Sequence, residues 1–207
     1  MNAKSTSLSQ YIPEKAVPVI KAYLEEISIT LKIAPPRGTK LGDYRPPTRH
    51  KPHRISVNNN LNSYAFLLTL VHEIAHAYTY EQYGRKAAPH GREWKNCFGR
   101  LMQPFLNTEI LPAELISKFS TYLASGRATS CADTELTVAL KKYDPNQDNR
   151  CFISELPYNK TFRWKKGRQF VKLKKLRKRY RCKELETDNI YLFSPVAEVE
   201  PVDDNLY

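Results

Sequence analysis

The sequence predicts an α+β protein whose first part is mainly helical and whose second part is a small antiparallel β subdomain. Up to about residue 126, apolar residues recur at helical spacing over long segments. After about residue 131, short β-like segments alternate with turn residues. We therefore expect two subdomains, residues 1–126 and 127–195, followed by an acidic tail at 196–207.

Four helices are expected in the first part. The longest follows Asn62, a good N-cap residue, and ends before Gly84, which is a typical residue just beyond a helix. Near Ser28 the first helix gives way to an alternating apolar pattern that is typical of a strand. The expected helices cover residues 18–26, 63–83, 90–102 and 112–123, and two short strands, 39–44 and 54–57, lie between the first two helices.

The second part is expected to contain only strands. Turn residues such as Lys166-Gly167 separate short segments rich in apolar and aromatic residues. The expected strands cover residues 136–140, 151–156, 161–164, 169–173, 179–182 and 190–193.

Nothing in the sequence predicts export or membrane insertion. The N-terminal segment is polar, and the longest mostly apolar stretch, Tyr64–Tyr80, is too short and too polar to span a bilayer. The cysteines form no CxxC pair, so free thiols are expected rather than disulfides, and we expect a cytoplasmic protein. The four cysteines are Cys97, Cys131, Cys151 and Cys182.

The strongest functional signal is the segment His72-Glu73-Ile74-Ala75-His76, which lies within the longest expected helix. Two histidines four positions apart lie on one face of a helix and can bind the same metal ion. A third protein ligand would leave one tetrahedral position open to water, which is how catalytic zinc sites differ from structural ones. We therefore expect one catalytic Zn²⁺, with Glu73 as the general base on a zinc-bound water.

Spacing alone leaves two candidates for the third ligand. His90 and Glu93 share a face of the next expected helix, so either could complete the site, and His90 is favoured. His50 and His53 fall in a Pro-rich segment and are expected to be loop histidines rather than ligands.

Four segments resemble the SprT-like (Spartan) family of zinc metalloproteases, which includes a protease that degrades proteins crosslinked to DNA. These segments are Leu41–Arg45, Ile55–Asn58, Thr69–Ala77 and His90–Trp94. The resemblance implies a zincin-like subdomain with a short β-hairpin, and it assigns the third ligand to His90. It also implies a zinc-ribbon-like second subdomain, but the isolated cysteines argue against a second, structural ion.

Charge predicts a polyanionic partner. The net charge is +12, and the segment 160–183 holds thirteen Lys or Arg residues and no acid. The aromatic residues within this segment are more simply explained as core residues of a small β subdomain. The residues expected to bind nucleic acid are Lys165, Lys166, Arg168, Lys172, Lys174, Lys175, Arg177, Lys178, Arg179 and Arg181.

Together these observations predict a zinc endopeptidase acting on proteins bound or crosslinked to DNA. The DNA is expected to be single-stranded or to have single-stranded character, and the protein to be associated with the nucleoid. Two alternatives remain open. One is a nucleic-acid-binding protein with a structural or vestigial zinc site, and the other is a general cytoplasmic metallopeptidase that does not depend on DNA.

Overall fold

The computed structural model describes residues 8–125, 134–145 and 149–202. It consists of two compact units, Met1–Asp144 (unit 1) and Pro145–Tyr207 (unit 2), and each has its own hydrophobic core. The mixed α+β class predicted from the sequence is confirmed. The boundary predicted at residue 126 and the thiol of Cys131 lie outside the described residues, and the two units divide after Asp144.

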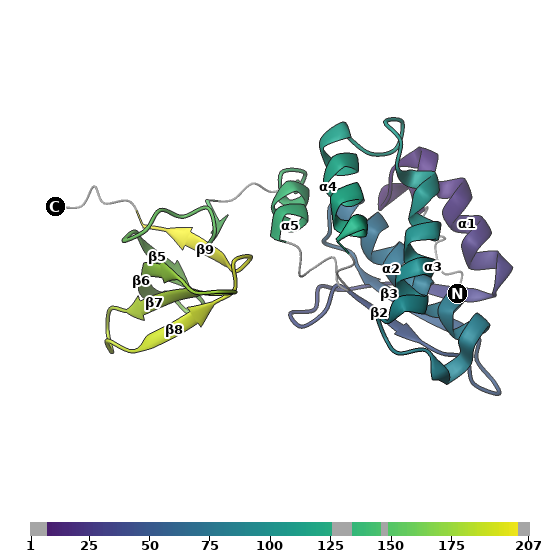
Figure 1. Cartoon of the computed structure of the whole chain (residues 1–207), viewed down its shortest axis with the longest axis horizontal. Helices are drawn as coiled ribbons and strands as arrows, with labels where there is room; N and C mark the ends of the chain where they lie inside the picture. Colours follow the sequence, from purple (N-terminus) through teal and green to yellow (C-terminus); the bar gives the residue numbers. More distant parts are fainter. Residues whose placement is uncertain (1–7, 126–133, 146–148, 203–207) are drawn as a thin grey trace, which may run out of the picture. The chain divides into compact units, whose positions relative to one another are not determined.

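Unit 1 contains five helices and a three-stranded sheet among its described residues (Figure 1). The four helices and the strands expected in its first 125 residues are all present, with small shifts at their ends. The elements are α1 Val17–Glu26, β1 Ile29–Ala34, β2 Gly42–Arg45, β3 His53–Asn58, α2 Ser63–Tyr83, α3 Arg92–Met102, α4 Ala113–Ala124 and α5 Thr134–Lys141.

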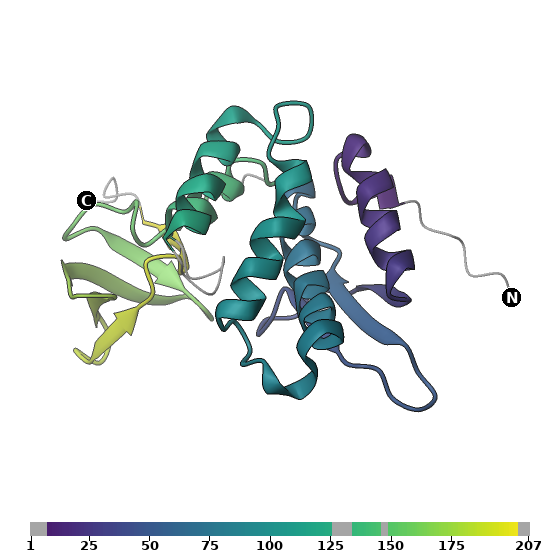
Figure 2. The ribbon, with the colours of Figure 1, turned by 45° about the vertical axis from the view of Figure 1, so that its right-hand side comes forward.

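The three-stranded sheet has the order β1-β3-β2. Strand β3 runs parallel to β1 and antiparallel to β2. On β3, Ile55 and Val57 are buried in the core of unit 1, whereas Arg54 and Ser56 lie on the other face. The sheet therefore has an inner face packed against the helices and an outer face. Figure 2 shows the loop between β2 and β3 extending beyond the helices.

Helix α2 is the central element of unit 1. The side-chain oxygen of Asn62 accepts hydrogen bonds from the backbone N–H groups of Tyr64 and Ala65, which caps the first turn. The helix ends at Gly84, whose φ of 59° suits glycine. Because α2 packs against β2, β3 and α3, more than half of its residues are buried. The segment that carries His72, Glu73 and His76 is thus held rigidly on several sides.

The strand predicted at residues 136–140 is wrong, because these residues belong to helix α5. Leu136, Ala139 and Leu140 are buried, and their spacing is that of one helical face. Helix α5 contacts α4, and the side-chain amide of Asn62 donates to the Leu140 carbonyl at 2.9 Å. Packing against unit 1 therefore decides the conformation of this short apolar segment.

Unit 2 is a six-stranded sheet with the order β4-β9-β5-β6-β7-β8, and Figure 1 shows β5 to β8 side by side. The β-rich second part predicted from the sequence is confirmed. The acidic segment from residue 196 is not simply a tail, because β9 lies between β4 and β5 with Val199 buried. The strands are β4 Cys151–Phe152, β5 Thr161–Trp164, β6 Arg168–Lys175, β7 Tyr180–Glu184, β8 Ile190–Phe193 and β9 Glu198–Pro201.

Aromatic side chains form the core of unit 2. Phe162 and Phe170 are fully buried, and both pack against Phe193. The prediction that the aromatics of the basic segment serve the core is confirmed for these two residues. Within the described ranges, none of the helices is long and apolar enough to cross a membrane.

Candidate metal centre and active site

Three histidines from two segments of unit 1 lie close together. His72 and His76 project from successive turns of α2, and His90 lies just before α3. The Nε2 atom of His90 is 3.0 Å from Nε2 of His72 and 3.1 Å from Nε2 of His76. Among the described residues, these histidines form the only group of three or more side chains that could hold a metal ion.

The spacing of these nitrogens fits a cation better than hydrogen bonds. A neutral imidazole nitrogen either carries one proton or offers one lone pair, so the Nε2 of His90 cannot donate to both neighbours. Nitrogens bound to one tetrahedral ion at about 2.0–2.1 Å lie about 3.3 Å apart, close to the distances observed. The group could therefore hold a metal ion through its three Nε2 atoms.

Burial keeps the three imidazoles in the neutral form that binds a metal. Burial, and then the neighbouring imidazoles, lower the pKa of His72 to about 3. The same two causes lower the pKa of His76 to about 4, and burial also lowers the pKa of His90. At neutral pH the lone pairs are thus free, and no proton must be displaced before a cation binds.

Trp94 supports all three histidines. Its ring lies 4.6 Å from His72, 5.3 Å from His76 and 4.7 Å from His90 between centroids, and it is 1% exposed. It also stacks on Phe98, one turn further along α3. His90 itself has a positive φ of 60°, which directs its ring back toward α2 from the turn that precedes α3. Helix α3 therefore fixes the third histidine through an aromatic platform.

Glu73 lies beside the histidines in a buried position. Its side chain is on α2, and the residue is 8% exposed. Burial, and then the nearby Asp43 carboxylate, raise the pKa of Glu73 to about 7, whereas Arg37 and Lys40 act in the opposite direction. A carboxyl group with a pKa near neutrality can both accept and release a proton, as a general base requires.

The backbone of β2 closes over Glu73. A Cβ atom at Gly42 would lie 2.5 Å from Oε1 of Glu73 and 2.8 Å from both its Cγ and the Cγ2 of Thr69. Gly42 is therefore needed because only a residue without a side chain lets the strand approach the carboxylate so closely.

Sequence reasoning missed a polar cluster of Tyr44, His53 and Glu81 next to the histidines. His53, expected to be a loop residue, begins β3 and is 3% exposed. Its Nδ1 lies 2.9 Å from the Tyr44 hydroxyl and its Nε2 lies 2.7 Å from a carboxylate oxygen of Glu81. The Tyr44 ring in turn stacks on His76, with an interplanar angle of 9°. These contacts join residues far apart in sequence, so no local pattern could have indicated them.

The alternative third ligand, Glu93, does not join the histidine group. Its carboxylate instead lies 3.6 Å from the Arg92 guanidinium. No disulfide involves the described cysteines Cys97, Cys151 and Cys182, and none of them belongs to a metal-binding group within the described residues.

Most of the residues predicted to bind nucleic acid lie on the surface of unit 2. They are found near the two turns at opposite ends of β6, the strand that pairs with both β5 and β7. We call these eight the hairpin cations, and seven are exposed while Arg181 is half-buried: Lys165, Lys166, Lys174, Lys175, Arg177, Lys178, Arg179 and Arg181.

Two of the predicted cations are placed differently. Lys172 is 2% exposed, and its ammonium donates to the Leu156 carbonyl and lies 4.2 Å from the centre of the Tyr180 ring. Burial lowers the pKa of Lys172. The Nε of Arg168 donates to the buried carboxylate of Glu184 at 2.5 Å, so its charge is compensated within unit 2. In this conformation Lys172 does not present its charge to a ligand.

One comparison with known proteins matches the part of unit 1 that holds the three histidines. Residues 20–114 match the SprT-like family, whose members have metallopeptidase-like functions. No curated protein and no solved structure matches the chain. The matched segment contains all three histidines, Glu73 and Gly42. Residues 20–114 of unit 1 are therefore similar to the SprT-like family.

Proposed function

We propose that the chain is a zinc-dependent endopeptidase that acts on DNA-associated or DNA-crosslinked proteins. The observation that carries this proposal is the convergence of three neutral imidazole nitrogens beside a buried carboxylate whose pKa is near 7. A site built only to hold zinc would use four protein ligands and would have no need of an adjacent base.

His72, His76 and His90 would hold the ion through Nε2, since these atoms face one another. A bound zinc ion would supply Lewis acidity, which polarises a peptide carbonyl and makes water more acidic. Glu73 would take the proton of the attacking water and pass it to the nitrogen of the departing amine. The buried position of Glu73 favours both transfers because its pKa is close to the working pH.

The hairpin cations support the DNA part of the proposal. They lie at both ends of β6, which has eight residues and is therefore about 25 Å long. Cations spread over this distance can neutralise several successive phosphates and release their counterions. Since Phe162 and Phe170 are buried, we expect binding to depend mainly on charge rather than on base stacking.

Replacement of the general base tests the chemical part of the proposal. We expect Glu73→Gln to retain zinc, because it keeps all three ligands, but to cleave a protein bound to single-stranded DNA at least about 10²-fold more slowly. Zinc content and melting temperature serve as controls for an intact site. Undiminished cleavage by a zinc-loaded Glu73→Gln variant would contradict the assigned role.

A matched pair of variants tests the DNA part. Arg177 and Lys178 are hairpin cations, whereas Arg85 and Lys86 are an exposed Arg-Lys pair on unit 1. Replacing Arg177 and Lys178 by Gln should weaken binding to single-stranded DNA and slow cleavage of DNA-bound protein, and the same change at Arg85 and Lys86 should do neither. Equal effects of both double variants on DNA binding would contradict a role for the hairpin.

The same assays separate the alternatives. Cleavage that is insensitive to DNA and to salt would indicate a general metallopeptidase. Binding of DNA and zinc with no cleavage of any DNA-bound protein would indicate a nucleic-acid-binding protein with a vestigial metal site.

A further inference from the structure

The outer face of the three-stranded sheet in unit 1 holds a cavity of about 590 Å³. It is separate from the metal centre, because none of the three histidines nor Glu73 lines it. Side chains from all three strands and from the segment after β1 form its walls. The residues that carry the argument are Lys32, Pro35, Arg37, Asp43, Arg45 and Arg54.

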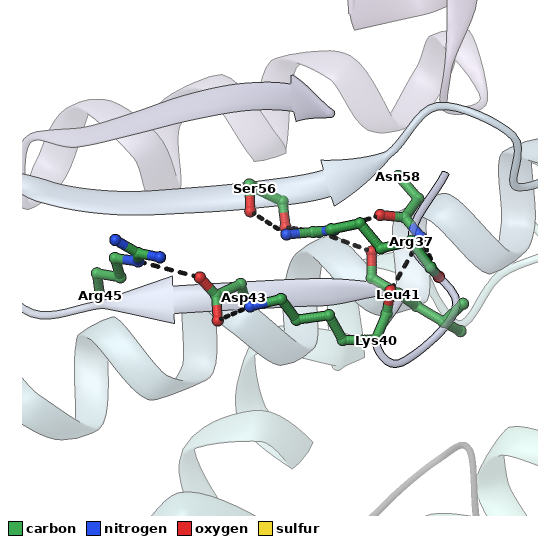
Figure 3. A network of polar contacts seen from close by, with 7 residues as sticks. All are labelled: Arg37, Lys40, Leu41, Asp43, Arg45, Ser56 and Asn58. Atoms are coloured by element: carbon green, nitrogen blue, oxygen red, sulfur yellow. Dashed lines mark hydrogen bonds and ion pairs between the residues drawn. The ribbon is translucent and has the colours of Figure 1, made fainter. Parts of the chain in front are cut away.

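Positive charge dominates the lining. Four of the lining residues are Lys or Arg, and Asp43 is the only acid, so the cavity has an excess of three positive charges. The carboxylate of Asp43 is already shared between Lys40 at 2.8 Å and Arg45 at 3.2 Å, as Figure 3 shows. It therefore leaves the charges of the other lining cations uncompensated.

Arg37 is bound only to neutral groups. Its guanidinium donates to the Asn58 side-chain oxygen at 2.7 Å and to the Ser56 hydroxyl at 3.0 Å (Figure 3). Further contacts reach the carbonyl oxygens of Ser56 and Leu41. These bonds fix the position of the guanidinium at the cavity wall but do not neutralise it.

Arg54 is placed against another cation. In the antiparallel pairing of β2 and β3 it lies directly opposite Arg45, and like charges at such positions destabilise a sheet. The Nε of Arg54 is buried and has no hydrogen-bond acceptor among the described residues. A buried donor without a partner carries a free-energy penalty, which an incoming anion would relieve.

We propose that this cavity is a phosphate-binding site. An excess of three charges suits a phosphate or a run of phosphates better than a single carboxylate, and guanidinium groups bind phosphate oxygens in a bidentate manner. The cavity volume exceeds that of one phosphate several-fold, so it accommodates either two linked phosphates or a short length of nucleic-acid backbone. Lys32 and Arg54 are the principal ligands, because neither is engaged with an acid in the ion pairs of the described residues.

The test uses the full chain and a local signal, because the hairpin cations of unit 2 would mask binding measured globally. Backbone amide NMR signals of β1 and β3 are followed during titration with inorganic pyrophosphate, and separately with a five-nucleotide oligothymidine. Ionic strength is held constant, with sodium acetate as the anion control. We expect saturable shifts in these strands with at least one phosphate probe and none with acetate.

The double variant Lys32→Gln, Arg54→Gln should weaken this binding at least about tenfold, since two charge-assisted contacts are lost. The control Lys21→Gln removes one charge from the exposed side of α1 and should leave it within about twofold. Saturation by pyrophosphate alone would identify a diphosphate ligand, and tighter binding of the oligonucleotide would identify a nucleic-acid strand.

Two results would overturn the proposal. One is the absence of saturable shifts in β1 and β3 with both phosphate probes, and the other is unchanged binding in the double variant. Misfolding is excluded by the amide spectrum of each variant, and loss of one of two opposed arginines is expected to leave the sheet intact. The outcome is independent of peptidase activity, because no cleavage is measured.

Discussion

Gly42 should be required for full catalytic activity although it bears no functional group. Replacing it with Ala would place a Cβ atom 2.5 Å from Oε1 of Glu73, whereas ordinary contact begins at about 3.4 Å. The carboxylate oxygen would therefore have to move by about 0.9 Å to restore a normal contact. Rotation of the terminal carboxylate alone cannot relieve the strain, because Cγ of Glu73 and Cγ2 of Thr69 are also too close, at 2.8 Å.

A displacement of about 1 Å in a catalytic group can reduce a rate about 10²-fold, which corresponds to about 2.7 kcal/mol of barrier. We expect the turnover of Gly42→Ala to fall by this factor, while zinc affinity stays unchanged because the three imidazoles are untouched. The overpacked contact should also cost about 1–3 kcal/mol of unfolding free energy.

The assay compares cleavage of a DNA-bound protein by zinc-loaded wild-type protein, Gly42→Ala and a control, Gly99→Ala. A Cβ atom at Gly99 in α3 would meet nothing within 4 Å, so the same chemical change should leave turnover unaltered there. Full activity of Gly42→Ala with a normal zinc content would refute the argument that β2 positions the base.

Four further outcomes are expected. His90→Gln should reduce zinc affinity by more than ~10- to 100-fold, which is the cost of losing a residue that only hydrogen-bonds to a ligand. Zinc affinity would be measured by competition with a chromophoric chelator, and a smaller reduction would contradict the role of His90 as a ligand. His53→Phe leaves the Tyr44 hydroxyl and the Glu81 carboxylate without their hydrogen bonds to His53, so the free energy of unfolding should fall by about 1–3 kcal/mol. Denaturant unfolding would measure this, and unchanged stability would contradict the importance of these contacts. Lys172→Met should leave the salt dependence of DNA binding unchanged, because the Lys172 side chain is buried. Loss of one hairpin cation should instead lower the slope of log binding constant against log salt concentration by about one. A lower slope for Lys172→Met would show that this lysine does contact phosphate. The Arg168 guanidinium lowers the pKa of Glu184 from 4.5 to about 2, so the pair stabilises unit 2 above pH 4.5 and this contribution is lost as the pH falls toward 2. Near neutral pH, Arg168→Gln should therefore be less stable than the wild type, and the difference should shrink below pH 4.5. Unfolding followed by circular dichroism at a series of pH values would measure this difference.

The helix that carries His72 and His76 could be predicted because its determinants are local. Asn62 and Gly84 mark its ends, and the spacing of His72 and His76 follows from helical geometry alone. The third ligand was harder, because spacing allowed both His90 and Glu93. In the structure His90, and not Glu93, joins the other two histidines, and its ring contacts the same tryptophan that they do.

The features that could not be predicted depend on contacts between distant segments. Helix α5 is short and apolar, so its pattern fits a strand as well as a helix until it is docked near Asn62. His53 binds Glu81, a residue 28 positions away, and nothing near it in sequence indicates this partner. Lys172 is different, because strand alternation places it on the same face as the buried Phe170, and that signal was present but was outweighed by the surrounding charges.

The placement of Trp94 gives the protein a built-in optical reporter. The chain has two tryptophans, Trp94 against the three imidazoles in unit 1 and Trp164 in unit 2. In a Trp164→Phe variant, the only remaining tryptophan would be Trp94, which contacts all three histidines. Binding and removal of a metal ion could then be followed by tryptophan fluorescence without an attached dye. Quenching by redox-active divalent ions would then rank their affinities in real time on an otherwise unlabelled chain.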